Sequence, residues 1–197
     1  MADTENRRRV AALAGHTGDP ARARALLHDP DPGVRATALG ALGRLGEARQ
    51  DEVGAALADP SPEVRRRGCQ VGIGVPGVDL ADMLADDDAG GVEMAAWALG
   101  ERADAAGDIV PRLSAVVRDH QDPLCREAAV AALGAIGDER GVPAILAATR
   151  DRPAIRRRAV IALAPFTGPD VEAALAAALE DRDWQVRQAA EDLSTDD

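Results

Sequence analysis

The sequence predicts an all-α protein, a right-handed α-solenoid of about six helix pairs preceded by an N-terminal capping helix. One phrase recurs about every thirty residues, and its clearest copy, DPDPGVRATALGALGRLG, spans residues 29–46. Such a period is typical of arrays whose units bury their apolar faces only against their neighbours. Aromatic residues make up only 2% of the chain, so Ala, Leu, Val and Ile must form the core. We expect one array over residues 1–197, with repeats at 19–193 and a disordered tail at 194–197.

The recurring phrase predicts the second helix of each pair. In the first copy Val34, Ala38 and Leu42 recur at the spacing of an amphipathic helix. Asp-Pro dipeptides precede this stripe, and Asp is a good N-cap while Pro suits the first turn. Glycines such as Gly46 and Gly137 fit the loops that follow. Further copies occur at residues 59–73, 89–100, 122–137, 152–164 and 183–193.

The first helix of each pair is shorter and less regular. The candidates are residues 21–28, 51–58, 78–85, 109–118, 142–149 and 171–180. An additional helix at about 5–14, within residues 1–18, is expected to cap the open end of the array. Glycines at 68–77 should end the second helix of the second pair early. This segment is either a tight packing contact, which we favour, or a flexible joint.

Composition argues against several classes of function. The net charge is −11, all 23 basic residues are Arg, and nucleic-acid binders usually carry a basic footprint. Nine acidic residues but only one Arg lie between positions 79 and 108. No stretch is long and apolar enough for a membrane helix, and no signal peptide is evident. We therefore expect a cytoplasmic, monomeric protein with two free cysteines, and the residue bias suggests a bacterial origin.

At the recurring phrase the sequence resembles the HEAT repeat family, in particular short bacterial HEAT-like repeats of the phycobilin-lyase type. The family phrase is an Asp, a Pro-containing turn, Val-Arg, and an Ala-Leu-Gly segment. It stands here as Asp29, Val34-Arg35 and 41–43, and again as Asp122, Arg126 and 132–134. The resemblance covers nearly the whole chain. It implies the solenoid fold but not one function, because the family includes scaffolds, adaptors, lyase subunits and enzymes.

The resemblance implies a structural ladder of Arg and Asp between successive repeats. Arg suits this role because its planar fork can bond two acceptors at once. An Arg row could alternatively bind phosphate or carboxylate groups, but the matched Asp row favours the structural role. The ladder residues are Arg35, Arg65, Arg126, Arg156 and Arg187 with Asp29, Asp59, Asp119, Asp151 and Asp181.

The family also implies that the second helices line the concave face. The helical register predicts that a mixed polar row faces outward there, with Trp97 near its middle as either a binding anchor or a core filler. Trp184 is expected to cover the C-terminal end of the core. The candidate partner-binding residues are Trp97, Glu93, Glu101, Glu127, Arg44, Arg66, Gln70 and Arg157.

No catalytic, metal or cofactor site is expected from the sequence. His16, His28 and His120 form no metal-binding pair, whereas metal-dependent hydroxylases built from HEAT repeats use repeated His-Glu pairs. Asp86-Asp87-Asp88 could hold a cation, but a solvated turn is favoured. We expect a non-catalytic scaffold or adaptor that holds another protein, possibly through a basic segment. The alternative is a lyase-like or chaperone subunit that handles a tetrapyrrole or other small cofactor.

Overall fold

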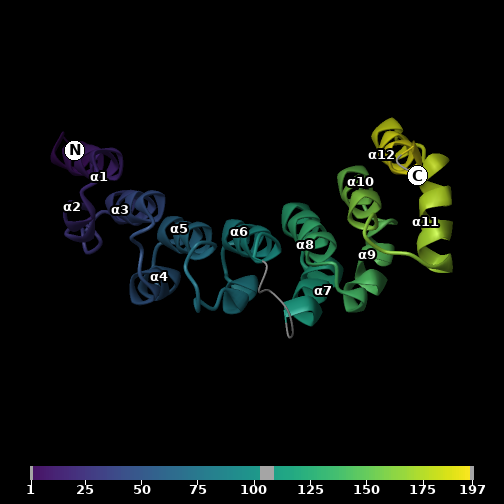
Figure 1. Ribbon diagram of the computed structural model, residues 1–197, viewed down its shortest axis with the longest axis horizontal. Coiled ribbons are helices and arrows are strands. Elements are labelled where there is room, and N and C mark those ends of the chain that lie inside the picture. The colour runs from purple at the N-terminus through teal and green to yellow at the C-terminus, as the bar shows by residue number, and fades with distance from the viewer. Residues whose placement is uncertain (1, 103–108, 196–197) are drawn as a thin grey trace. The chain divides into compact units, whose positions relative to one another are not determined.

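The computed structural model describes residues 2–102 and 109–195, and the regular elements in these ranges are all helices, without a strand (Figure 1). None of its helices is long and apolar enough to cross a membrane. The elements are α1 Ala2–Thr17, α2 Pro20–Arg24, α3 Pro32–Leu45, α4 Gln50–Leu57, α5 Pro62–Gly72, η1 Ala81–Ala85, α6 Ala89–Gly100, α7 Ile109–Asp119, α8 Pro123–Ile136, η2 Glu139–Gly141, α9 Val142–Ala148, α10 Pro153–Ala162, α11 Pro169–Leu179 and α12 Trp184–Thr195.

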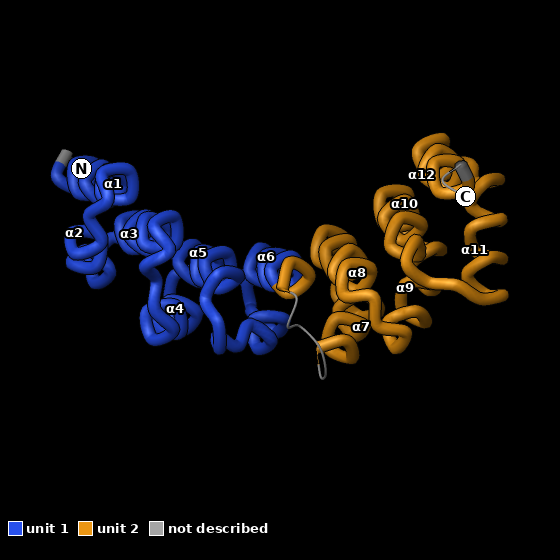
Figure 2. Tube along the Cα trace, viewed as in Figure 1, with its two compact units in different colours: residues 1–98 blue, residues 99–197 orange. Residues whose placement is uncertain are grey.

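The helices form two compact units, residues 1–98 and 99–197 (Figure 2). In the first unit α1, α3, α5 and α6 lie side by side in one row, and α2, α4 and η1 form a second row (Figure 1). In the second unit α8, α10 and α12 form the row of second helices, and α7, α9 and α11 pack against them. Each unit is therefore a stack of α-solenoid helix pairs. One continuous array across residue 98 stays a prediction.

Local sequence sets both ends of the second helices. The side chain of Asp31 accepts a hydrogen bond from the backbone N–H of Val34, and that of Asp122 accepts one from Leu124. At the other end Gly46 and Gly137 both have a φ of 69°. Residues with a Cβ rarely adopt this left-handed conformation, which explains the glycine that ends each of these helices.

Two first helices are shorter than the sequence suggests. The segment expected to be helical at 78–85 forms only the 3₁₀ turn η1, because Gly77 turns the chain at a φ of 78° and the Asp79 carboxylate binds the N–H of Ala81. The helix expected at 21–28 is regular only through α2. At the opposite end of the chain, Ser194 and Thr195 belong to α12 and not to a tail, whereas residues 196 and 197 lie outside the described residues.

The glycine-rich segment after Gly68 ends α5 early, at Gly72. Both glycines lie at close helix contacts. A Cβ added at Gly68 would lie 3.0 Å from the Leu57 side chain and 3.2 Å from the Leu57 backbone nitrogen, and one at Gly72 would lie 3.0 Å from Leu80. These contacts support the packing interpretation of the segment over a flexible joint.

The core of each unit consists of aliphatic side chains. Buried residues include Leu39, Leu42 and Val53 in the first unit, and Leu113, Leu133, Ile145, Ile155 and Leu163 in the second. Cys69 and Cys125 are free and buried, and burial raises the pKa of the Cys69 thiol to about 12. The thiol of Cys69 is therefore protonated at neutral pH and acts as a small apolar side chain.

Trp184 does not cover the C-terminal end of the core as the sequence suggested. It is 65% exposed at the start of α12, and the terminal cluster closes without it. The small side chains of Val186, Ala189 and Ala190 pack against Val160 and Ala178 instead.

Candidate partner-binding site

The Arg-Asp pairs lie inside each unit, between one helix pair and the next. Each of the four arginines Arg35, Arg65, Arg126 and Arg156 uses Nε and Nη2 to bond both carboxylate oxygens of an Asp in the next repeat, at distances between 2.6 and 3.0 Å. Its Nη1 bonds a backbone carbonyl in the turn before its own helix. The pairs are Arg35–Asp59, Arg65–Asp86, Arg126–Asp151 and Arg156–Asp181. These arginines are already bonded to carboxylates and carbonyls of the protein, and they do not form a row that is open to a ligand.

The first carboxylate of the ladder, Asp29, is bonded by Arg7, which is not among the ladder residues predicted from the sequence. Arg7 Nε lies 2.7 Å from Asp29 Oδ2, and the Asp29 side chain is 4% exposed. The helix α1 therefore contributes a ladder arginine, as the second helices of the later repeats do. The signal in the sequence is the spacing between Arg7 and Arg35, which is close to one repeat. At the far end Arg187 bonds the Asp181 carbonyl oxygen at 2.7 Å, and no carboxylate pair is seen for it among the described residues.

Asp119 is not a ladder residue, contrary to the sequence prediction. It is exposed at the end of α7, and it makes no ion pair in the described part of the chain. His120 takes the ladder position, and its Nδ1 accepts the N–H of Asp122 at 3.1 Å. Other repeats use an Asp oxygen for this bond, as Asp59 does for Ser61. In α6, Val92 stands where other repeats have the arginine.

Asp86 takes a ladder role that was not predicted from the sequence. The Asp86-Asp87-Asp88 run was expected to be a solvated turn, but the Asp86 side chain is only 5% exposed and is bonded by Arg65. Asp88 binds the backbone N–H of Gly91 at the start of α6, whereas the Asp87 side chain is 92% exposed. Among the described residues, no group of three or more His, Cys, Asp or Glu is placed to hold a metal ion.

We expect the protein to lose stability in acid as the ladder carboxylates become protonated. Hydrogen bonds from Arg65, Arg126 and Arg156 hold the pKa values of Asp86, Asp151 and Asp181 below the ordinary 3.8. Because a depressed pKa stabilises the fold above the unfolded-state value, this contribution is present above about pH 4 and is lost as pH falls through the folded-state pKa. Urea unfolding followed by circular dichroism from pH 7 to pH 2.5 should show this decline, and a constant midpoint below pH 4 would contradict it.

All but one of the candidate partner-binding residues are exposed, and they are divided between the two units. The first unit carries Trp97, which is 43% exposed, together with Glu93, Arg44, Arg66 and Gln70. The second unit carries Glu101 and Arg157, both exposed. Glu127 is the exception because it is half-buried, with Oε1 3.7 Å from Nε of Arg158. Trp97 is therefore not a fully buried core filler.

The acidic segment at 79–108 contributes little to this face of the first unit. Of its described acids there, only Glu93 lies on the exposed side of a second helix. Asp79, Asp82 and Asp87 are exposed before α6, in the loop and the 3₁₀ turn. Asp104 and Asp108 lie outside the described residues. The basic partner segment expected from the acidic stretch stays a prediction.

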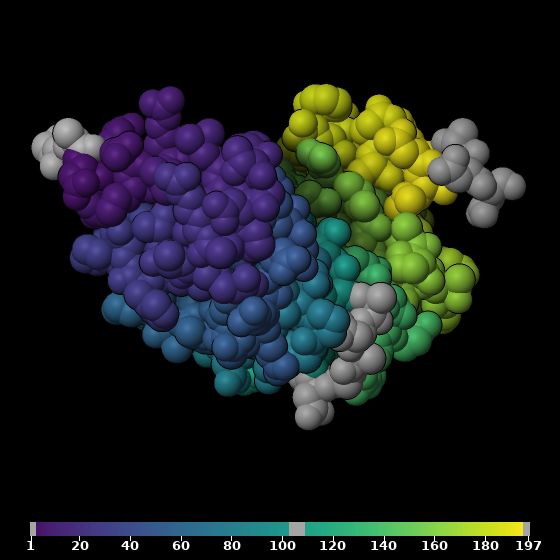
Figure 3. All heavy atoms as spheres, turned by 60° about the vertical axis from the view of Figure 1, so that its left-hand side comes forward, coloured from purple at the N-terminus to yellow at the C-terminus, as the bar shows by residue number. Residues whose placement is uncertain are grey.

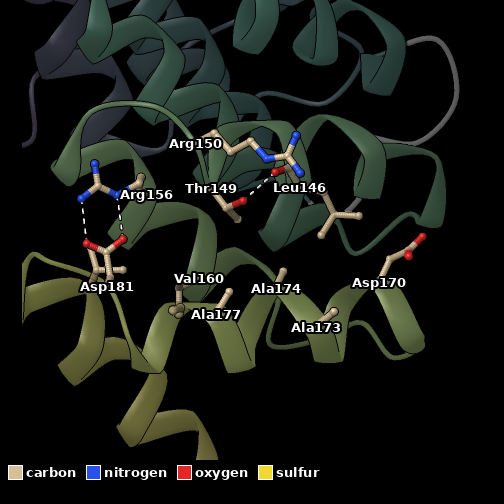
Figure 4. A pocket seen from close by; sticks show the side chains of 12 residues that line it. Leu146, Thr149, Arg150, Arg156, Val160, Asp170, Ala173, Ala174, Ala177 and Asp181 are labelled. Atoms are coloured by element: carbon tan, nitrogen blue, oxygen red, sulfur yellow. Dashed lines mark hydrogen bonds and ion pairs between the residues drawn. The ribbon is translucent and has the colours of Figure 1, made fainter.

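Two surface grooves lie between neighbouring first helices. One, of about 420 Å³, lies between α9 and α11, where Leu146 and Thr149 face Ala173 and Ala174 (Figure 4). The paired Arg156 and Asp181 close one end of it. The other groove, of about 670 Å³, lies between α2 and α4 and is lined at its base by Arg35 and its bonded Asp59. The ladder residues that line both grooves are already bonded to each other.

A profile of HEAT repeats matches residues 2–71 and 78–164, which is well over half of the chain. The chain belongs to the HEAT repeat family. A profile of the PBS lyase HEAT-like repeat also matches residues 155–181. These repeats contain α10 and the turn that carries Asp181, so the ladder is part of the matched sequence.

Solved structures agree with the HEAT repeat fold. Human deoxyhypusine hydroxylase, solved in complex with glycerol, aligns with a TM-score of 0.51 and 23% identity over 96% of this chain and 78% of that chain. The Escherichia coli protein YibA aligns with a TM-score of 0.63 and 19% identity, over 86% of this chain and 67% of its own. At these identities the likeness shows the fold alone. No curated protein matches the chain.

Proposed function

We propose that this HEAT repeat protein is a non-catalytic scaffold or adaptor that holds another protein on the exposed face of its second helices. The observation that carries this proposal is Trp97, a large apolar side chain that is 43% exposed on α6 although smaller residues fill the core around it. Trp is enriched among the residues that dominate protein–protein binding. Exposed polar residues on the same row, among them Glu93 and Gln70, would form the rim of such an interface.

The chemistry of the remaining polar groups supports a binding role over catalysis. The ladder arginines and their carboxylates are bonded to each other, and the Cys69 thiol is buried and protonated. An enzyme needs a nucleophile, acid or base with access to its substrate. In the groove between α9 and α11, the hydroxyl of Thr149 donates a hydrogen bond to the Leu146 carbonyl at 2.7 Å, beside the paired Arg156 and Asp181.

A second candidate function is a lyase-like or chaperone role toward a tetrapyrrole or another small cofactor. It is favoured by the match of residues 155–181 to the PBS lyase HEAT-like repeat. The groove in Figure 4 borders this region and has the volume of a small-molecule site, but its lining holds four alanines and no aromatic side chain. An absorption spectrum of protein purified from its own host separates the two functions, because a stoichiometric visible chromophore would favour this second one.

The Trp97→Ala substitution tests the scaffold function. Affinity capture from the native host, followed by mass spectrometry, first supplies a partner. Trp97→Ala should then weaken binding of that partner by about 2 kcal/mol or more if Trp97 is a central anchor. Trp184→Ala is the matched control, because Trp184 is equally large and more exposed but lies in the other unit. Titration calorimetry measures both. Equal affinities for the wild type and a folded Trp97→Ala variant would remove Trp97 from the site.

A further inference from the structure

The exposed face of the second helices in the first unit carries arginines that lie over glycines of the neighbouring helix. A Cβ added at Gly15 of α1 would lie 2.7 Å from Nη1 of Arg44, which belongs to α3. A Cβ at Gly40 of α3 would lie between 3.3 and 3.4 Å from Nε, Cδ and Cζ of Arg67, which belongs to α5. In both cases the glycine leaves the space that the guanidinium occupies.

The same arrangement recurs toward the following helix. Arg8 of α1 lies over Gly33 of α3, where an added Cβ would be 3.6 Å from Nη1. Arg66 of α5 lies over Gly90 of α6, where the corresponding distance is 2.8 Å. We name Arg8, Arg44, Arg66 and Arg67 the arginine face. Arg8, Arg44 and Arg66 are exposed and Arg67 is half-buried, and α1, α3, α5 and α6 lie in one row (Figure 1).

The arginine face differs from the ladder in how its charges are paired. Arg8 lies 3.9 Å from Glu63, and Arg66 lies 3.6 Å from Asp88, both beyond normal hydrogen-bond distance. Arg67 bonds the neutral Gln70. No ion pair of Arg44 is seen among the described residues. Ladder arginines, in contrast, make two short bonds to one carboxylate. The guanidinium groups of this face therefore keep donors for a ligand.

We propose that the arginine face binds an acidic segment of the partner protein, rich in Asp and Glu. This inference rests on the scaffold function proposed above and specifies the chemistry of its partner. Guanidinium groups match carboxylates with two parallel hydrogen bonds, and resting on glycines reduces the side-chain freedom that binding would otherwise remove. Trp97 occupies on α6 the repeat position that Gly40 occupies on α3, so an apolar residue of the segment would contact it.

Charge favours a short acidic protein segment over a nucleic acid. The chain carries a net charge of −11, so a long polyanion that extends beyond the arginine face would meet like charge. Glu63 and Glu93 lie on the same face, and Asp79, Asp82 and Asp87 are exposed before α6. A segment of a few carboxylates can contact the arginines and avoid these acids. Figure 3 shows the surface of the first unit, coloured by residue number from purple through blue to teal.

A fluorescein-labelled peptide of about twelve residues, alternating Glu and Ser, tests the proposal by fluorescence anisotropy with the full-length protein. We expect saturable binding at low ionic strength that weakens as salt rises. The double substitution Arg44→Gln and Arg67→Gln should weaken binding roughly tenfold. Arg22→Gln, on the exposed side of α2 in the same unit, is the matched control and should change the affinity less than about twofold.

Three results would overturn the proposal. They are an absence of saturable binding at low salt, equal affinities of the double variant and the Arg22→Gln control, and tighter binding of single-stranded DNA of the same charge. If the double variant does not melt like the wild type, the single variants Arg44→Gln and Arg67→Gln replace it. If Trp97→Ala weakens binding of a captured partner but Arg44→Gln does not change it, the proposal of an acidic segment is overturned and the scaffold function still stands.

Discussion

Arg156→Ala should lower the free energy of unfolding by about 2–4 kcal/mol. The Arg156 residue is 6% exposed, and its guanidinium joins both oxygens of Asp181 to the carbonyl of Asp151, with three bonds between 2.8 and 2.9 Å. Removing it leaves a carboxylate, 15% exposed, with reduced access to water. The expected loss lies below that of a fully buried pair because some solvent still reaches Asp181.

Urea unfolding of the Arg156→Ala variant measures this effect. Arg157→Ala is the matched control, because Arg157 is the next residue on α10 but is exposed and should cost less than about 0.5 kcal/mol. If the two variants were equally stable, the ladder pair would contribute nothing to stability. Because each repeat contacts only its neighbours, the loss should also weaken the adjacent helices α11 and α12, which hydrogen exchange can locate.

Gly134→Ala should destabilise the second unit by about 1–3 kcal/mol, and Gly134→Val by at least the upper end of that range. A Cβ at Gly134 would lie 2.7 Å from both Cα and Cβ of Ala162 and 3.0 Å from its carbonyl oxygen. Backbone atoms cannot turn aside as a flexible side chain can. The new methyl group would therefore push α8 away from α10 and loosen the contacts between them.

The matched control for Gly134 is Gly54→Ala, in α4. A Cβ at Gly54 meets nothing within 4 Å, so Ala should stabilise that helix by about 0.5–1 kcal/mol through its lower conformational freedom in the unfolded chain. If the helix spacing depends on Gly134, thermal melts should show a lower melting temperature for Gly134→Ala and a higher one for Gly54→Ala than for the wild type. A Gly134→Ala variant as stable as the wild type would show that α8 and α10 separate without cost.

The sequence alone was enough to predict the helical solenoid, the HEAT repeat family and the caps of the second helices. These features depend on local patterns: the apolar stripe of Val34, Ala38 and Leu42, the Asp-Pro turns, and the glycines that end helices. The early end of α5 follows from the same local chemistry, because several glycines in one turn weaken a helix wherever it lies. Repetition strengthened each local signal by showing it several times.

Only the tertiary structure decided which charges are paired and which are available. Asp86 and Asp119 both precede a second helix, yet only Asp86 pairs with an arginine, Arg65, which comes from the second helix of the preceding repeat. Arg7 and Arg8 are adjacent in the sequence, but one bonds Asp29 and the other lies over Gly33. Neighbours on a helix point in directions about 100° apart, so their partners come from different elements of the fold.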